Sequence, residues 1–320
     1  MSSGDSMNRM CLITFYAGDL PPYFRFFVES CKRNPDVQFI VFNDRIGSDR
    51  HEENVLLKKL SLGEFERLVE DKTGLRVKVP RGYKLNDFKP LYRLLFEDHL
   101  RDHGFWGHCD VDLIFGKIGD FITEDLLEKY DVITSKPKWI SGHFSVFRNN
   151  AFCRRLFEQN PSHRWILEDS EHNWFMDESC RRWKGEFYTI EQLLAANMPV
   201  SMYDVVRNLQ QAGKLRAAFT DFIREHTLCD RVDYLYKDGR LTDLTKGEDF
   251  FYHHLITIKT FWHFYVPGGE RVPDAYRITD GGIRSLTDQA GWRYGVWQAK
   301  RAAYYARGVV RSVLRHARLG

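Results

Sequence analysis

The stretch Met10-Cys-Leu-Ile-Thr-Phe-Tyr16 is a short apolar run that ends before Pro21-Pro22 and indicates a buried strand. A helix is expected next, because apolar side chains recur at positions 24, 27, 28 and 31. A second apolar run covers residues 37–42 and ends at Asn43-Asp44. We therefore predict a strand–helix–strand unit whose right-handed crossover makes the sheet parallel at its start.

The alternation of strands and helices continues through the first half of the chain. Residues 54–60 indicate a third strand, and Ser61-Leu-Gly-Glu64 has the capping-box spacing that begins a helix. Pro90 suits the first turn of another helix, which we expect to run to about Leu100. Residues 131–135 indicate a further short strand, so the pattern predicts an α/β fold.

The pattern becomes more irregular after about residue 145. We predict helices near residues 150–159, 163–183 and 190–197, followed by a hairpin around Asp238-Gly239, because Asp-Gly is a strong turn signal. Residues 250–262 form a strand-like run. No clear linker divides the chain, and we predict one mixed α/β unit over residues 1–285.

Composition excludes several classes of protein. With 43% hydrophobic and 15% aromatic residues, the 320-residue chain can bury a full core. The chain has no run of about 18 apolar residues and its start lacks the features of a secretory signal, so we expect a cytoplasmic protein. The six cysteines lack Cys-x-x-Cys spacing, which favours buried free thiols over a zinc site or a disulfide framework.

Residues 286–320 form a basic, aromatic tail. Six arginines, one lysine and no acidic residue lie within residues 291–320, whereas the whole chain has a net charge of +3. We predict a basic amphipathic C-terminal helix that contacts an anionic surface at the inner face of the cytoplasmic membrane. The alternative is a helix packed on its own domain. Nucleic acid is not expected as a partner, because no recognition motif accompanies the charge.

Residues 105–116, Phe-Trp-Gly-His-Cys-Asp-Val-Asp-Leu-Ile-Phe-Gly, place two carboxylates within an apolar run. In an extended backbone at a strand end, Asp110 and Asp112 would share one face. Buried charges need partners, and a divalent cation or a cationic group would supply one. We predict that Asp110 and Asp112 bind Mn²⁺ or Mg²⁺. The alternative is an acid pair that only ends the strand or caps the next element.

Two further segments carry candidate ligand-binding residues. Lys84, Asp87 and Lys89 surround the start of the helix that precedes the acid pair, and helix N-termini and lysines both attract phosphate. Asp87 could cap that helix, bind a sugar hydroxyl or offset the lysines, and a capped surface helix with solvated lysines is the alternative. Gly142 permits close approach of a ligand beside His143, whereas a turn with His143 satisfied by the backbone is equally compatible.

Acids and histidines later in the chain complete the candidates. Asp177 and Glu178 follow packed aromatic residues and could include a general base, although solvated helix acids are more common. His253 and His254 are neighbours in the strand-like run, so at most one of them should face a given site, where it could complete metal coordination. Lys259 could contact a diphosphate.

The order of these motifs resembles that of GT-A-type, nucleotide-sugar-dependent glycosyltransferases with a DxD motif, especially bacterial surface-polysaccharide enzymes. Phe15 and Tyr16 end the early strand where such enzymes contact the nucleotide, and the segment from Trp106 to Asp112 looks like their DxD segment. His254 and Lys259 are similar to a late metal and diphosphate contact in glycogenin-like enzymes. The Gly-Gly-x-Tyr-x-Asp lead and the late His-x-Gly pattern of those enzymes are absent. The resemblance therefore leaves open whether the reaction would retain or invert the anomeric configuration of the sugar.

The resemblance implies a GT-A-like Rossmann-type mixed sheet flanked by helices, with Mn²⁺ or Mg²⁺ as cofactor. It also implies a nucleotide-sugar donor, UDP-linked, and a glycan or lipid-linked glycan acceptor in bacterial surface polysaccharide synthesis. In an inverting reaction Asp177 or Glu178 would act as the base, and in a retaining one neither need do so.

Two other functions compete with hexosyl transfer. A metal-dependent nucleotidyltransferase or phosphodiesterase would use the same acid pair with further carboxylates around two ions, which the sequence does not place. A non-catalytic, membrane-associated carbohydrate-binding protein would explain the aromatic residues and the tail but not the acid pair.

Overall fold

The computed structural model describes residues 9–176, 188–225, 232–261, 264–269 and 271–286. Within these ranges the largest sheet has the strand order β3 (Arg50–Glu52), β4 (Val55–Lys59), β2 (Val37–Asn43), β1 (Met10–Tyr16), β5 (Phe105–Cys109), β8 (Phe144–Arg148), β7 (Val132–Thr134) and β9 (Ala217–Phe219). Strands β4, β2, β1 and β5 are parallel, as the early strand–helix–strand unit predicted. Strand β8 runs antiparallel to both of its neighbours, so the sheet is mixed.

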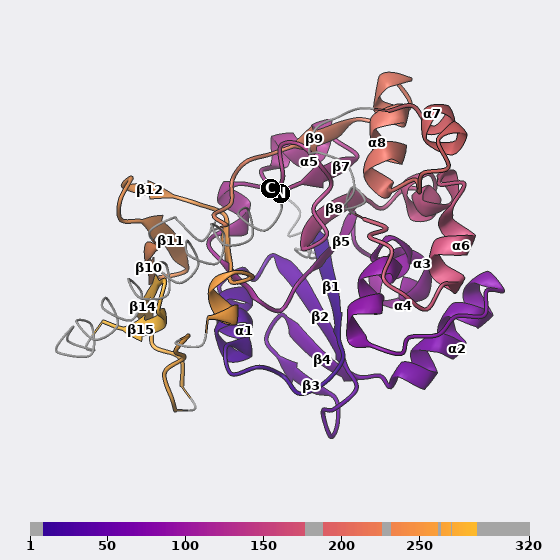
Figure 1. Cartoon of the computed structure of the whole chain (residues 1–320). Coiled ribbons are helices and arrows are strands. Elements are labelled where there is room, and N and C mark those ends of the chain that lie inside the picture. Colours follow the sequence, from indigo (N-terminus) through magenta and orange to yellow (C-terminus); the bar gives the residue numbers. More distant parts are fainter. Residues whose placement is uncertain (1–8, 177–187, 226–231, 262–263, 270, 287–320) are drawn as a thin grey trace, which may run out of the picture.

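Helices cover both faces of this sheet (Figure 1). One face carries α1 (Phe24–Lys32) and α5 (Glu124–Lys129). The other face carries α2 (Leu62–Thr73), α3 (Tyr92–Leu95), α4 (Glu97–Leu100), α6 (His163–Glu168), α7 (Ile190–Ala195) and α8 (Met202–Gln211). Short 3₁₀ helices connect these elements, namely η1 (Gly82–Leu91), η2 (Ile118–Asp120), η3 (Cys153–Gln159) and η4 (Ile258–Thr260).

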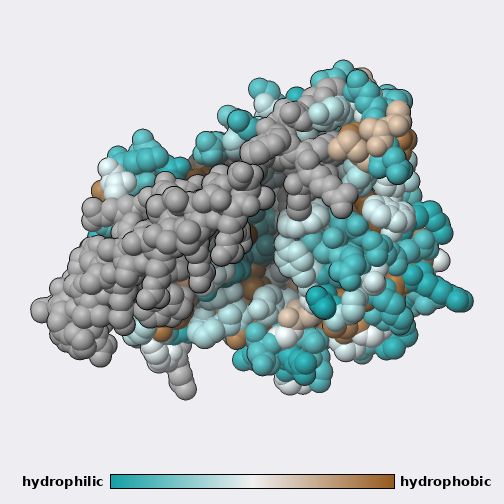
Figure 2. All heavy atoms as spheres, viewed as in Figure 1, coloured by the Kyte–Doolittle hydropathy of each residue, from teal (hydrophilic) through white to brown (hydrophobic). Residues whose placement is uncertain are grey.

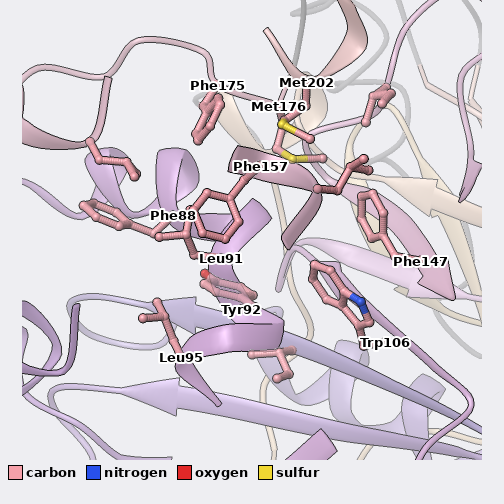
Figure 3. Close-up of a cluster of buried hydrophobic side chains, with 14 of the residues drawn as sticks. Phe88, Leu91, Tyr92, Leu95, Trp106, Phe147, Phe157, Phe175, Met176 and Met202 are labelled. Atoms are coloured by element: carbon pink, nitrogen blue, oxygen red, sulfur yellow. The ribbon is translucent and has the colours of Figure 1, made fainter. Parts of the chain in front are cut away.

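Alternating side chains of the central strands supply the two cores. Along β1, Cys11, Ile13 and Phe15 belong to the core under α2 and α3, whereas Met10 and Leu12 belong to the core under α1. This is the period of two that a strand buried on both faces requires. Figure 3 shows the first of these cores, where residues of η1 and α3 lie close to strand residues such as Trp106 and Phe147. The Trp106 and Phe147 rings stack with their centroids 4.7 Å apart.

A second, antiparallel sheet lies beside the first, in the strand order β12 (Glu248–Asp249), β11 (Arg240–Asp243), β10 (Asp233–Lys237), β14 (Ala275–Thr279) and β15 (Gly282–Ser285). The predicted hairpin is confirmed as β10 and β11. Asp238 and Gly239 form its turn with φ of 52° and 77°, which is the positive-φ geometry of a two-residue hairpin loop.

Two short strands, β6 (Leu113–Phe115) and β13 (Tyr252–His254), pair antiparallel and join the two halves of the chain. Strand β6 begins directly after Asp112, and β13 contains both candidate histidines. This pairing is what positions the late residues against the early ones.

Three predicted elements are wrong in extent. The helix expected to run from Pro90 to Leu100 is instead η1, with Pro90 inside it, followed by the two short helices α3 and α4. The helix expected over residues 163–183 ends at Glu168. The described part of the strand-like run over residues 250–262, which ends at residue 261, contains β13 and then η4 rather than one continuous strand.

The predicted fold class, a mixed α/β sheet flanked by helices, is confirmed. Four cysteines (Cys11, Cys31, Cys109 and Cys153) are buried free thiols as predicted, and Cys180 and Cys229 lie outside the described residues. The predicted C-terminal helix of residues 286–320 also lies outside them, apart from residue 286. On the face drawn in Figure 2 the described surface is mostly hydrophilic, with an apolar patch where α7 and α8 lie in Figure 1. No helix among the described residues combines the length and apolarity needed to span a bilayer.

Candidate functional site

Asp110 and Asp112 lie at the carboxyl end of β5, at the centre of the large sheet. The two carboxylates converge, with ligand atoms within 4.8 Å of each other, as predicted. The extended strand predicted to bring them together is wrong, because the backbone turns at Val111 and Asp112 before β6 begins. The turn is fixed by long-range hydrogen bonds. Asp110 N donates to His143 O at 3.1 Å, and Leu255 N donates to Asp112 O at 3.0 Å. The carboxylates are therefore placed by tertiary contacts rather than by strand periodicity.

Close packing of β8 against β5 supports this position. Gly107 lies in β5, where an added Cβ would meet Ser145 O at 2.4 Å. Only glycine fits there without moving β8. The glycine of the Trp-Gly-His segment before the acid pair is therefore required by the packing of β8 on β5.

His254 joins the acid pair, and His253 does not. In β13 His254 pairs with Leu113, and its Nε2 lies 3.3 Å from Asp112 Oδ2. His253 faces away, with its Nδ1 3.1 Å from Arg224 O and its ring against Tyr234. The opposite orientation of the two histidines follows from strand alternation, as expected.

The residues Asp110, Asp112 and His254 fit a divalent cation. One ligand atom from each lies within 4.8 Å of the others. Two carboxylates and an imidazole match the preference of Mn²⁺, and carboxylates also suit Mg²⁺. The Asp112 side chain is only 6% exposed and that of Asp110 is 31% exposed, so the group is open to solvent on the Asp110 side.

Lysines contact both carboxylates. Lys89 is buried and its Nζ donates to Asp110 Oδ1 at 2.5 Å and to Gly142 O at 2.7 Å. Lys259 lies in η4 and forms an ion pair with Asp112. The structure therefore brings the predicted residues Lys89, Gly142 and Lys259 to the acid pair.

Glu225 is a member of the site that sequence reasoning missed. Its Oε1 lies 2.7 Å from His254 Nδ1 and 3.3 Å from His143 Nε2, and Lys136 forms an ion pair with it. Glu225 follows an isolated bridge between Arg224 and His253, which sets it beside His254. It belongs to no helix or strand and to no motif, so only its tertiary position identifies it.

Burial and electrostatic interactions shift the pKa values of four site residues, namely Asp112, His254, Glu225 and His143. Burial alone would raise the pKa of Asp112, but the positive charges of His254 and Lys259 hold it well below its ordinary value. Burial alone would lower the pKa of His254, but Asp112 and Glu225 raise it to about 9. Glu225 resembles Asp112, since burial alone would raise its pKa, but the hydrogen bond from His254 and the charges of His143, His254 and Lys136 together lower it. Burial, together with the nearby charge of His254, lowers the pKa of His143.

Lys84 and Asp87 lie in a separate buried network. Lys84 Nζ donates to Asp87 Oδ2, Ile166 O and Glu171 O at 3.0, 2.6 and 2.9 Å. Asp87 accepts hydrogen bonds from Asn173 N at 2.7 Å and Phe175 N at 3.0 Å. The pair holds the segment 166–175 in place, and the alternative of solvated lysines is wrong for Lys84 and Lys89. Contact of Lys84 and Asp87 with a cofactor stays a prediction.

Of the remaining predicted residues, one lies in the core, one lies at the sheet edge near the acid pair, and two lie outside the described residues. Phe15 is buried and packs edge-on against Phe65 with ring centroids 5.2 Å apart, so its ring belongs to the core. Tyr16 is half-buried at the end of β1, and the parallel register of β1 with β5 places it level with the acid pair. Asp177 and Glu178 lie outside the described residues.

Fold and site together define a mixed α/β protein with a candidate cation site at the carboxyl edge of its sheet. The chain belongs to the family described as "Family of unknown function (DUF6625)", which matches residues 12–284. No curated protein matches the chain. Among solved structures, it is similar to the galactosyltransferase LgtC in complex with donor and acceptor sugar analogs, with a TM-score of 0.31 and 9% identity over 59% of this chain and 70% of that chain.

Proposed function

We propose that this chain is a metal-dependent glycosyltransferase of the hexosyltransferase type. It would move a sugar from a nucleotide diphosphate sugar, UDP-linked in the resembling family, to a glycan or lipid-linked glycan acceptor. The observation that supports this proposal is the convergence of Asp110, Asp112 and His254 with the ammonium groups of Lys89 and Lys259 at one edge of the sheet. A cation group surrounded by lysines suits a diphosphate leaving group.

The charge balance of the site supports an anionic ligand. Each of the carboxylates Asp110, Asp112 and Glu225 already has a lysine partner. A divalent cation added to this balanced group would leave a net positive charge. Such a charge is complementary to a diphosphate and would be poorly compensated without one.

Each residue has a distinct role in the proposed reaction. Asp110, Asp112 and His254 would hold the cation, which supplies positive charge to the diphosphate oxygens as the bond to the sugar breaks. Lys89 and Lys259 would donate hydrogen bonds to the same leaving group. Tyr16 would line the nucleotide side, because it ends β1 at the same edge. Asp177 and Glu178 remain the acids proposed as base if the reaction inverts.

A panel of nucleotide sugars, incubated with and without Mn²⁺, tests this function. We expect Mn²⁺-dependent release of the nucleoside diphosphate, reduced roughly 10²–10³-fold by Asp112→Asn. Asp274→Asn is the matched control, because Asp274 is an exposed partner of Arg33 away from the site. Undiminished activity of Asp112→Asn would contradict the mechanism. Absence of any turnover, with binding of free glycan retained, would favour the carbohydrate-binding alternative.

The two-ion phosphodiesterase or nucleotidyltransferase is less compatible with the geometry. A second group of possible ligands, His143, Glu225 and His254, does lie beside the first. The two groups share His254 through opposite ring nitrogens, since Nε2 faces Asp112 and Nδ1 faces Glu225. Two ions on one imidazole would lie roughly 6 Å apart, given metal–nitrogen bonds of about 2 Å. Two-metal catalysis requires a separation of about 3.5–4 Å.

A further inference from the structure

The imidazole of His254 is held from both sides. Its Nε2 faces Asp112 Oδ2 at 3.3 Å, and its Nδ1 lies 2.7 Å from Glu225 Oε1. The side chain is 3% exposed, so water cannot replace Glu225 as the partner of Nδ1. Glu225 therefore favours a hydrogen on Nδ1, so that Nε2 is the nitrogen that would lose its hydrogen to a cation.

Glu225 is itself fixed by neighbours from other elements. Lys136 forms an ion pair with its second oxygen, Oε2, and His143 Nε2 lies 3.3 Å from Oε1. The His143 ring also packs on the His254 ring, with centroids 4.2 Å apart. These contacts hold Glu225 in the position in which Oε1 faces His254 Nδ1.

We propose that Glu225 is a positioning residue for the cation, acting through His254. By accepting the hydrogen bond from Nδ1–H, it presents the lone pair of Nε2 to the space between Asp110 and Asp112. The same bond stops the ring from rotating. The inference rests on the proposed function in one respect, that Asp110, Asp112 and His254 hold a divalent cation. A carboxylate behind a metal-binding histidine typically contributes 10–100-fold to metal affinity.

The competing arrangement makes Glu225 a ligand itself. A cation held by His143, Glu225 and His254 would need Nδ1 without its hydrogen and would take Glu225 Oε1 from that hydrogen bond, while Lys136 keeps Oε2. Nε2 of His254 would still face Asp112. The two arrangements differ in the number of ions bound and in the nitrogen that is coordinated, so one titration separates them.

Mn²⁺ titration followed by electron paramagnetic resonance provides the test, with the full chain and no nucleotide. We expect one tightly bound Mn²⁺ per wild-type chain and a nitrogen coupling in the pulsed spectrum that His254→Ala abolishes. Glu225→Ala should weaken binding 10–100-fold and reduce that coupling. Glu225→Gln, which still offers an oxygen to Nδ1–H, should recover part of both. Glu248→Gln is the control, because Glu248 is an exposed neighbour that pairs with Arg224.

The outcomes are distinguishable. Wild-type Mn²⁺ affinity and an unchanged nitrogen coupling in folded Glu225→Ala and Glu225→Gln would overturn the role of Glu225 and leave the proposed function standing. Two bound ions in the wild type, one of them lost in Glu225→Ala, would make Glu225 a ligand and would also overturn it. A wild-type chain that binds no Mn²⁺ would overturn the positioning role together with the proposed cation site.

Discussion

Substitution of Lys84 by methionine removes the ammonium group at the centre of the buried network that holds residues 166–175. Lys84 and Asp87 have side chains that are 1% and 0% exposed, so neither can be rehydrated without unfolding. The variant leaves Ile166 O and Glu171 O without this donor and Asp87 without its lysine partner. Breaking a buried ion pair from one side costs about 3–5 kcal/mol. With an entropy of unfolding of about 2.1 cal/mol/K per residue, this corresponds to a fall in Tm of roughly 4–7 °C for 320 residues.

Urea unfolding followed by circular dichroism measures this loss, with Lys78→Met as the control. Lys78 pairs with Glu66 at the surface and is 80% exposed, so its substitution should change the free energy of unfolding by less than about 1 kcal/mol. Mn²⁺ binding by Lys84→Met should equal that of the wild type below its melting range, because Nζ contacts neither Asp110 nor Asp112. A loss of stability no larger than that of the control would refute the structural role of Lys84.

Three further predictions concern the site. Mn²⁺ binding should strengthen from pH 6 to about pH 9, because the cation displaces the proton of His254, whose pKa is raised to about 9. Calorimetry in two buffers with different ionisation enthalpies measures the released proton. A Mn²⁺ affinity that does not change with pH would contradict this prediction. In the metal-free protein His254 stabilises the fold fully below its ordinary pKa of 6.5 and loses that contribution as pH rises through about 9. Asp112 and Glu225, whose pKa values are lowered, stabilise it above their ordinary values of 3.8 and 4.5 and lose that contribution as pH falls below them, so the urea midpoint should be highest near pH 5–6.5. Lys89→Met should reduce turnover of a nucleotide sugar by roughly 10²–10³-fold without weakening Mn²⁺ binding, since it frees Asp110; equal turnover in Lys89→Met and Lys78→Met would exclude a phosphate contact.

Local patterns were sufficient for the first two strands of the chain, for one helix cap and for one hairpin turn. The runs at Met10–Tyr16 and Val37–Asn43 are buried on both faces, and such strands are visible in sequence because most of their residues are apolar. The capping box at Ser61 and Glu64 and the Asp238-Gly239 turn depend on neighbouring residues alone. Each of these features was therefore predictable without knowledge of the tertiary structure.

Predictions failed where distant groups replaced local hydrogen bonds. The helix expected to continue past Glu168 ends because Asp87 captures the backbone N–H groups of Asn173 and Phe175. Trp174, between them, has a φ of 57°, which no helix allows. A carboxylate more than 80 residues away thus decides the course of this segment.

The candidate site was predictable in its ligand types but not in its assembly. Asp110 and Asp112 are conspicuous because they interrupt an apolar run, and strand alternation correctly limited the choice to one of His253 and His254. Glu225 had no such signal, because its place beside His254 is set by the bridge between Arg224 and His253. Lys84 and Lys89 look alike in sequence, yet one supports a loop and the other contacts Asp110.

The pairing of β6 with β13 has a consequence for how the chain reaches its active form. Asp112 and Lys259 are separated by 147 residues, so the site exists only after a long loop has closed. Contacts of such high sequence separation form late and slowly. On the ribosome, a nascent chain would present its acid pair well before His254 and Lys259 emerge. Premature cation binding to Asp110 and Asp112 alone would then be weak, and tight binding would report that synthesis and closure are complete.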